Sequence, residues 1–244
     1  MIEDVKKQLQ EEDSIAHYNG RDRVVSSREF WETEASKIHT EKKYMTGIQS
    51  LDRLMDGIET GEVIVISGPT KMGKTTLAET FSKNLYYMMK VNSLWLSYEV
   101  RPIHFLNKYR LPQQPLIYVP MALKTGEGTL KWLEERVVEA KVKHDCRVVF
   151  IDHLHFIVDL FRIKSNASLE IGQTMRYLKQ NIAIKHNVAV VLIAHLMKIK
   201  LDKEPDESDI RDSSFVAQEA DSTLMVYRVA DHKDDFGNPV YENK

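Results

Sequence analysis

The chain has 244 residues, 43% of them hydrophobic and 29% charged, and a formal net charge of −2 at pH 7. These values suit one α/β domain with an appendage, and they exclude a global basic field that would draw the protein onto nucleic acid. The single cysteine excludes a disulfide framework, and the apolar runs have the length of strands, so we expect no membrane span.

Residues 1–43 are mostly polar, and we predict that they form an N-terminal arm or linker separate from a domain over residues 44–244. Within the arm, Ser27 can cap a helix from about residue 28 to residue 38. Phe30, Trp31 and Ile38 give that helix a short apolar face. The sequence leaves open whether the helix packs on its own domain or on a neighbouring chain.

The rest of the chain alternates short apolar segments with segments rich in helix-forming residues. A short helix between turns is expected within residues 46–58. Strands are predicted over residues 63–66, 93–97, 116–119, 147–151, 189–194 and 223–227. Helices are predicted over residues 76–89, 102–109, 129–143 and 169–186. The alternation predicts an α/β fold in which helices cover both faces of a mostly parallel sheet.

The helix at 169–186 should carry one apolar stripe, whose residues are spaced four, three and four apart: Ile171, Met175, Leu178 and Ile182. Asn187 can end this helix. Thr129 can cap the helix that precedes it. The charged stretch 198–212 is expected to be a loop.

The most specific motif is G-x-x-x-x-G-K-[S/T], which predicts a loop that cradles phosphate groups. It is matched by Gly68, Pro69, Thr70, Lys71, Met72, Gly73, Lys74 and Thr75, and Thr76 follows. A predicted strand precedes the motif and a predicted helix follows it, so the N–H groups of the loop should point at an anion. We therefore expect a site for ATP with Mg²⁺. The alternative is a Gly-rich turn without a ligand.

Three polar residues follow predicted strands, at the edge of a parallel sheet where ligands collect: Glu99, Asp152 and His195. In phosphoryl transfer, Lys74 would contact phosphates, and Thr75 with Asp152 would hold Mg²⁺. Glu99 would deprotonate the attacking water, and His195 would donate a hydrogen bond to the γ-phosphate. The alternatives are a polar strand end for Asp152, a solvated carboxylate for Glu99 and a structural histidine for His195.

A zinc site is conceivable at His153 and His155, because residues two apart on a strand share one face. We favour Mg²⁺, which serves this chemistry, since no cysteine lies near.

From residue 46 to residue 228 the chain resembles the RecA-like motor domain of DnaB-type hexameric replicative helicases. Residues 97–100 (Ser-Tyr-Glu-Val) are similar to the family's Ser-Leu-Glu-Met, whose Glu is the catalytic base, and residues 151–154 (Ile-Asp-His-Leu) to its Ile-Asp-Tyr-Leu. The most specific match is the segment 208–214 with 218–221. Residues 193–196 (Ile-Ala-His-Leu) are instead closer to phage primase-helicases and mitochondrial Twinkle.

This resemblance implies a homo-oligomer, a ring of six, with ATP between subunits and single-stranded DNA in the channel. The implied DNA-binding loops are residues 161–168 and 198–211, with Arg162, Lys164, Lys198 and Lys200 as candidate contacts. The second loop is also acidic, so a solvated surface loop remains open. The family's helical domain that meets primase is not matched, which leaves a primase or loader partner uncertain. Its Lys/Arg finger hairpin lies beyond the matched segments, so we expect that hairpin to be truncated.

Three functions are compatible with these residues and with the resemblance. The first is an ATP-dependent DNA helicase motor that hydrolyses ATP to translocate on single-stranded DNA and unwind duplex during replication. The second is a RecA-, RadA- or KaiC-like DNA-binding or regulatory ATPase, and the third is a non-motor accessory protein that binds ATP. The expected location is the cytoplasm, of a bacterium or of a phage host.

Overall fold

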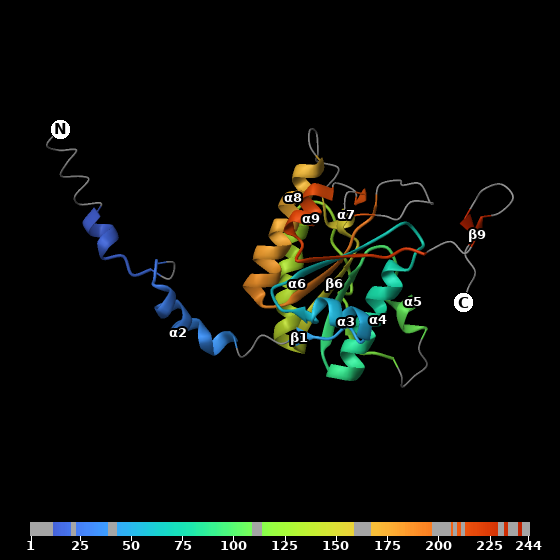
Figure 1. Cartoon of the computed structure of the whole chain (residues 1–244), viewed down its shortest axis with the longest axis horizontal. Coiled ribbons are helices and arrows are strands. Elements are labelled where there is room, and N and C mark those ends of the chain that lie inside the picture. The colour runs from blue at the N-terminus through green and yellow to red at the C-terminus, as the bar shows by residue number, and fades with distance from the viewer. Residues whose placement is uncertain are drawn as a thin grey trace. The chain divides into compact units, whose positions relative to one another are not determined.

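The computed structural model of the protein describes residues 12–20, 23–38, 43–108, 114–158, 167–196, 206, 209–210, 213–228, 232–233 and 239–240. The chain divides into two compact units, Met1–Glu41 and Lys42–Lys244, and Figure 1 labels several of their elements. None of the helices in these ranges is long and apolar enough to cross a membrane.

Helix α2 (Ser27–Ile38) lies in the first unit. The backbone N–H of Glu29 donates to the hydroxyl oxygen of Ser26 at 3.1 Å. Ser26 therefore holds the capping position, and the prediction of Ser27 is wrong by one residue, because Ser27 is already helical. Phe30 and Trp31 are exposed, so apolar side chains lie on the surface of this helix.

Six strands of the second unit form one sheet in the order β5–β4–β6–β7–β3–β8, in which every neighbouring pair is parallel. The strands are β3 (Val63–Ser67), β4 (Asn92–Ser97), β5 (Ile117–Tyr118), β6 (Cys146–Asp152), β7 (Ala189–Ile193) and β8 (Ser222–Met225). Each one overlaps a predicted strand, so the predicted α/β fold with a parallel central sheet is confirmed.

Two short antiparallel pairs have no counterpart in the sequence prediction. They are β1 (Lys43–Tyr44) with β2 (Ile58–Glu59), and β9 (His232–Lys233) with β10 (Pro239–Val240). Strands of two residues are too short to show the alternation from which strands are predicted.

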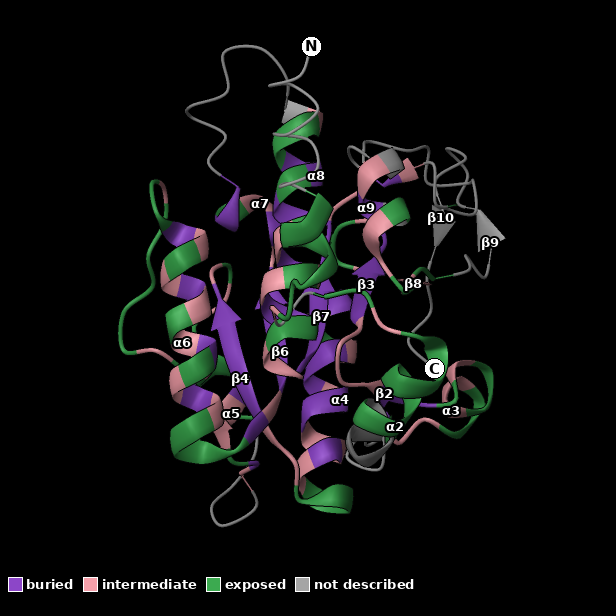
Figure 2. Ribbon diagram, turned by 90° about the vertical axis from the view of Figure 1, so that its left-hand side faces the viewer, coloured by how far each residue is buried: buried purple, intermediate pink, exposed green. Residues whose placement is uncertain are grey.

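Helices pack on both faces of the sheet, as predicted. They are α3 (Gln49–Met55), α4 (Lys74–Met89), α5 (Pro102–Leu106), α6 (Thr129–His144), α7 (Leu154–Ile157), α8 (Ala167–Tyr177), the π-helical segment η1 (Leu178–Ile184) and α9 (Ser213–Glu219). One buried cluster joins the sheet to α6, α7, α8, η1 and α9, and a second joins it to α3 and α4. In Figure 2 the central strands are buried and the helices show exposed outer faces.

Strand β3 shows why these segments form a sheet between two layers. Val63 and Val65 belong to one cluster and Ile64 and Ile66 to the other, and all four are fully buried. Side chains alternate between the two faces of a strand, so a continuous β-branched run suits a strand covered on both sides. Each side chain of this kind stabilises the fold by about 1.5–3 kcal/mol on burial.

The stretch predicted as one helix over residues 169–186 contains a π-helical segment. The four residues of the predicted stripe are all fully buried, which confirms the stripe. Ala183 is also fully buried and lies five residues after Leu178, the spacing of a π-helix. Asn187 ends the helix with a left-handed φ of 49°, as expected.

Helix α6 begins differently from the prediction. Gly128, with a φ of 73°, precedes the helix, and the Thr129 hydroxyl donates to the Gly126 carbonyl at 2.6 Å. Thr129 therefore closes the preceding turn and is not the helix cap. Helices α7 and α9 have four and seven residues, too few for the periodicity from which helices are predicted.

Candidate active site

The Gly-rich loop connects β3 to α4, at the carboxyl edge of the sheet. Gly68 has a φ of 149°, and a Cβ atom there would lie 2.0 Å from the Val226 carbonyl oxygen. The Val226 N–H donates to the Ser67 carbonyl at 2.7 Å, so the loop leaves the sheet in direct contact with the chain beyond β8. Gly73, with a φ of 102°, directly precedes α4, and among the described residues no side chain caps this helix.

Lys74 and Thr75 are the first residues of α4. Lys74 is 6% exposed, and its ammonium donates to the carbonyl oxygens of Gly68 at 2.8 Å and Pro69 at 3.0 Å. Burial lowers the pKa of Lys74, against the opposing effect of the Glu99 and Asp152 carboxylates. The buried Lys74 ammonium is therefore held by backbone carbonyls of the Gly-rich loop itself.

Asp152 ends β6, the strand between β4 and β7. The Thr75 hydroxyl donates to its Oδ2 at 2.9 Å, which joins the Gly-rich loop to the middle of the sheet. The residue is fully buried, and its Oδ1 has no hydrogen-bond partner among the described residues. Burial raises the pKa of Asp152 to about 6, although the Thr75 hydrogen bond acts in the opposite direction.

The Thr75 and Asp152 pair suits Mg²⁺. Magnesium prefers oxygen ligands and usually takes one or two carboxylates from the protein. A cation beside Asp152 would also meet the unpartnered Oδ1 and favour the ionised carboxylate, which burial disfavours. The residues present therefore fit the ion expected from the sequence.

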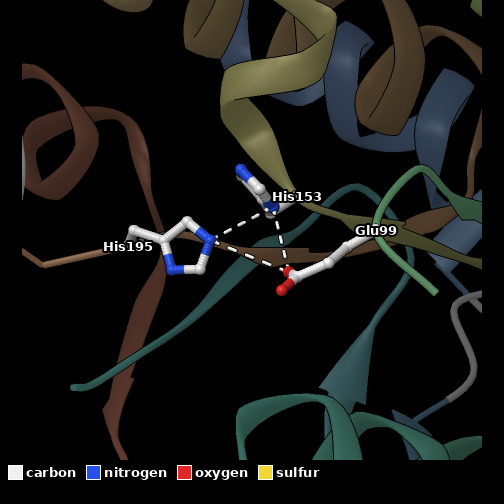
Figure 3. A group of neighbouring side chains, drawn as sticks. All are labelled: Glu99, His153 and His195. Carbon is white, nitrogen blue, oxygen red and sulfur yellow. Dashed lines mark hydrogen bonds and ion pairs between the residues drawn. The ribbon is translucent and has the colours of Figure 1, made fainter. Parts of the chain in front are cut away.

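Three side chains from neighbouring strands meet beside this carboxylate (Figure 3). Glu99 follows β4, His153 follows β6 and His195 follows β7. His153 Nδ1 lies 3.3 Å from Glu99 Oε2 and 3.2 Å from His195 Nε2, and His195 Nε2 lies 3.8 Å from Glu99 Oε2. The structure thus brings together Lys74, Thr75, Asp152, Glu99 and His195, the side chains that the sequence placed at one edge.

Hydrogen bonds to backbone carbonyls fix the segments that carry these side chains. The Tyr98 N–H donates to the Asp152 carbonyl at 2.7 Å, next to Glu99. The Ser67 hydroxyl donates to the Ala194 carbonyl at 3.0 Å, next to His195. Glu99 and His195 each adjoin a residue that is hydrogen-bonded to a neighbouring strand, so the sheet fixes the position of their backbone.

His153 is the site residue that sequence reasoning missed as a partner of Glu99. Its position directly after Asp152 could have indicated a place at the same edge of the sheet, but the sequence analysis paired it with His155 on a strand. That pairing is wrong, because β6 ends at Asp152 and His155 lies within α7. Burial, and after it the neighbouring His195, lowers the pKa of His153 to about 3, so the imidazole is neutral at pH 7.

The candidate DNA contacts Arg162, Lys164, Lys198 and Lys200 lie outside the described residues. Within the charged stretch 198–212, Ile210 is described, and it is fully buried and bridges to Leu196. At this point the stretch is therefore packed against the sheet edge.

The segment 218–221, part of the most specific match in the sequence, is bound to the neighbouring elements by hydrogen bonds and ion pairs. The Val63 N–H donates to Asp221 Oδ2 at 2.7 Å, and the Lys179 ammonium donates to Asp221 Oδ1 at 2.6 Å. Arg176 donates to Glu219 at 2.8 Å. These bonds hold α9 and the start of β8 against β3, α8 and η1.

Replacing Gly68 with alanine should destabilise the fold through collision with the Val226 carbonyl. We expect the free energy of unfolding in urea to fall by about 1–3 kcal/mol, the usual cost of overpacking. Gly126→Ala is the matched control, since Gly126 also has a positive φ of 82° but nothing within 4 Å of the added Cβ. An equal loss in both variants would show that strain, not the contact with Val226, sets the cost.

Replacing Asp152 with asparagine should stabilise the protein in the presence of EDTA. The folded pKa of about 6 lies above the ordinary 3.8, so the folded state binds the proton more tightly and this group lowers stability as pH rises between these values. The gain should approach about 3 kcal/mol near pH 7.5 and vanish near pH 4. Urea unfolding at both pH values measures it, and a loss of stability near pH 7.5 would contradict the expected burial cost.

The sequence matches the family described as "DnaB-like helicase C terminal domain" over residues 44–119 and 107–239. A probable replicative DNA helicase of Trieres chinensis is 29% identical over 215 residues, which are 75% of this chain and 47% of the relative. The replicative DNA helicase DnaB of Geobacillus stearothermophilus is 25% identical over 230 residues, which are 82% of this chain and 49% of the relative.

The fold is similar to those of solved proteins. A solved ATPase domain aligns with a TM-score of 0.68 and 20% identity, over 84% of each chain. A chain from "The Structure Of A DnaB-Like Replicative Helicase And Its Interactions With Primase" aligns with a TM-score of 0.66 and 20% identity, over 83% of this chain and 58% of that one. The predicted RecA-like fold is confirmed.

The chain spans about half the length of the curated relatives that it matches. The family match nevertheless extends from residue 44 to residue 239, and so includes the Gly-rich loop, the site and the sheet that carries them. The chain therefore belongs to the family of DnaB-like helicase C-terminal domains.

Proposed function

We propose that this chain is the motor domain of an ATP-dependent replicative DNA helicase, which hydrolyses ATP to translocate on single-stranded DNA and unwind duplex. The observation that carries the proposal is the hydrogen bond between Thr75 of the Gly-rich loop and the buried Asp152, with Lys74 and Glu99 beside them. A Gly-rich turn without a ligand gives no reason to bury an ionisable carboxyl group behind it.

Lys74 and the N–H groups at the start of α4 would bind the phosphates of ATP, since both present positive charge at the loop. Thr75 and Asp152 would hold Mg²⁺. When bound, Mg²⁺ supplies positive charge that offsets the negative charge of the β- and γ-phosphates.

Glu99 would act as the general base, because its side chain is 47% exposed and can reach water. It would accept a proton as the water oxygen forms its bond to the γ-phosphorus, and the bond to the bridging oxygen would break to leave ADP. His153 would position the Glu99 carboxylate through the contact at 3.3 Å. His195 would contact the γ-phosphate and respond to its loss.

We extend the proposal to partners. The chain would assemble as a hexameric ring and bind single-stranded DNA through the phosphate backbone, with Arg162, Lys164, Lys198 and Lys200 as the contacts. It would act in the cytoplasm of a bacterium or of a phage host. Support comes from the family membership and from the names of the relatives, which are replicative helicases.

The motor proposal predicts ATP hydrolysis that single-stranded DNA accelerates. Steady-state phosphate release should rise on addition of the DNA, and light scattering should give the mass of a ring. Because phosphate contacts dominate such binding, the acceleration should weaken steeply as salt increases. A monomer that binds ATP but does not turn it over, with DNA or without it, would contradict the motor and support an accessory ATP-binding module.

Replacing Glu99 with glutamine should remove the general base and leave ATP binding intact. We expect turnover to fall by about 10²–10⁴-fold, with the dissociation constant for ATP within a few-fold of the wild type. Glu135→Gln, on the exposed face of α6, is the matched control and should leave both values unchanged. Unchanged turnover in a folded Glu99→Gln protein would remove Glu99 from the mechanism.

A further inference from the structure

We infer that Glu99, His153 and His195 bind one divalent transition-metal ion of the zinc class, at a site distinct from that proposed for Mg²⁺. The three side chains come from the ends of three adjacent parallel strands and point toward one another (Figure 3). One ligand atom from each lies within 4.8 Å of the other two.

The spacing of these atoms matches one face of a tetrahedral metal site. Zinc bonds to nitrogen and oxygen of about 2.0–2.2 Å place neighbouring ligand atoms about 3.3–3.6 Å apart in a tetrahedron. The three edges measured here are 3.2, 3.3 and 3.8 Å. Two histidines with one glutamate, and a fourth position left to water, form a recognised zinc ligand set.

Hydrogen bonding explains this arrangement less well than a cation does. His153 Nδ1 faces both His195 Nε2 and Glu99 Oε2, at nearly equal distances. A single N–H can point along only one of these directions. An ion between the three atoms accepts a lone pair from each of them, and the histidines then carry their protons on the other ring nitrogens.

The two proposed sites differ in the metal that they select. Thr75 and Asp152 offer only oxygen, which suits Mg²⁺, whereas two imidazoles suit zinc, nickel or copper. The side chains of His153, His195 and Glu99 are 12%, 27% and 47% exposed. The two histidines are therefore largely shielded from solvent, whereas Glu99 is open to it, so an ion can enter from the Glu99 side.

Cobalt(II) is the probe, because four-coordinate Co²⁺ has intense visible absorption bands and six-coordinate Co²⁺ has weak ones. The full chain, cleared of metal with EDTA and kept in excess Mg²⁺, should bind one Co²⁺ with the intense bands, and Zn²⁺ should displace it. His153→Ala and His195→Ala should each weaken binding by about 100-fold or more. His104→Ala, an exposed histidine on α5, is the matched control and should bind Co²⁺ as the wild type does.

Absence of the intense bands, or bands that persist unchanged in both histidine variants, would overturn the site. Circular dichroism establishes that each variant is folded. If His153→Ala unfolds, then His195→Ala, at the more exposed position, decides the question alone.

The ion would also regulate the proposed reaction, and this part rests on the proposed function. An ion that holds Glu99 keeps it from accepting a proton, so Zn²⁺ should inhibit ATP hydrolysis in excess Mg²⁺, and EDTA added in slight excess over the Zn²⁺ should restore it. Unchanged turnover at a Zn²⁺ concentration that displaces all the Co²⁺ would overturn the regulation. A metal-free protein without ATPase activity that still binds Co²⁺ would instead contradict the motor and support the metal site.

Discussion

The parallel register of the central strands is the constraint on which the site depends. Ser97 pairs with Asp152, Asp152 with Ile193, and Ile193 with Ile66, so four strands end at one level. Parallel strands present their carboxyl ends at the same edge. The Gly-rich loop, Glu99, Asp152, His153 and His195 are neighbours because each follows a strand in this register, although they are far apart in the sequence.

At this same edge of the sheet, two ionisable side chains are buried, which costs free energy of folding. Lys74 and Asp152 are buried and ionisable, and their pKa values are shifted in the directions that disfavour charge. The two apolar clusters on either side of the strands offset that cost. Perturbed groups of this kind gather at functional sites. Here Asp152 ends β6, a strand covered on both faces, and the buried Lys74 side chain at the start of α4 interacts with its carboxylate.

Much of this arrangement follows from the sequence. The Gly-rich loop is predictable because its residues have fixed spacing, and β3, β6 and β7 because continuous β-branched runs are typical of strands buried on both faces. Glu99, Asp152 and His195 could be placed at one edge because each comes at or soon after the end of a short apolar segment that predicts a strand. The apolar stripe of the long helix followed from a spacing of three and four residues.

Other features could not be predicted because they depend on contacts across the fold. The triangle of Glu99, His153 and His195 requires the register of three strands and the side-chain directions at their ends, neither of which one segment contains. The π-helical segment η1 lies within a sequence that reads as an ordinary helix. The choice of Ser26 over Ser27 as the cap of α2 depends on a single hydrogen bond.

The central claim is that Thr75 and Asp152 form one Mg²⁺ site with the nucleotide held by the Gly-rich loop. Calorimetry with a non-hydrolysable ATP analogue, with and without Mg²⁺, tests it most directly in the wild type and in Asp152→Asn. We predict that Mg²⁺ tightens binding by about tenfold or more in the wild type and much less in the variant. An equal effect of Mg²⁺ on both proteins would contradict the claim.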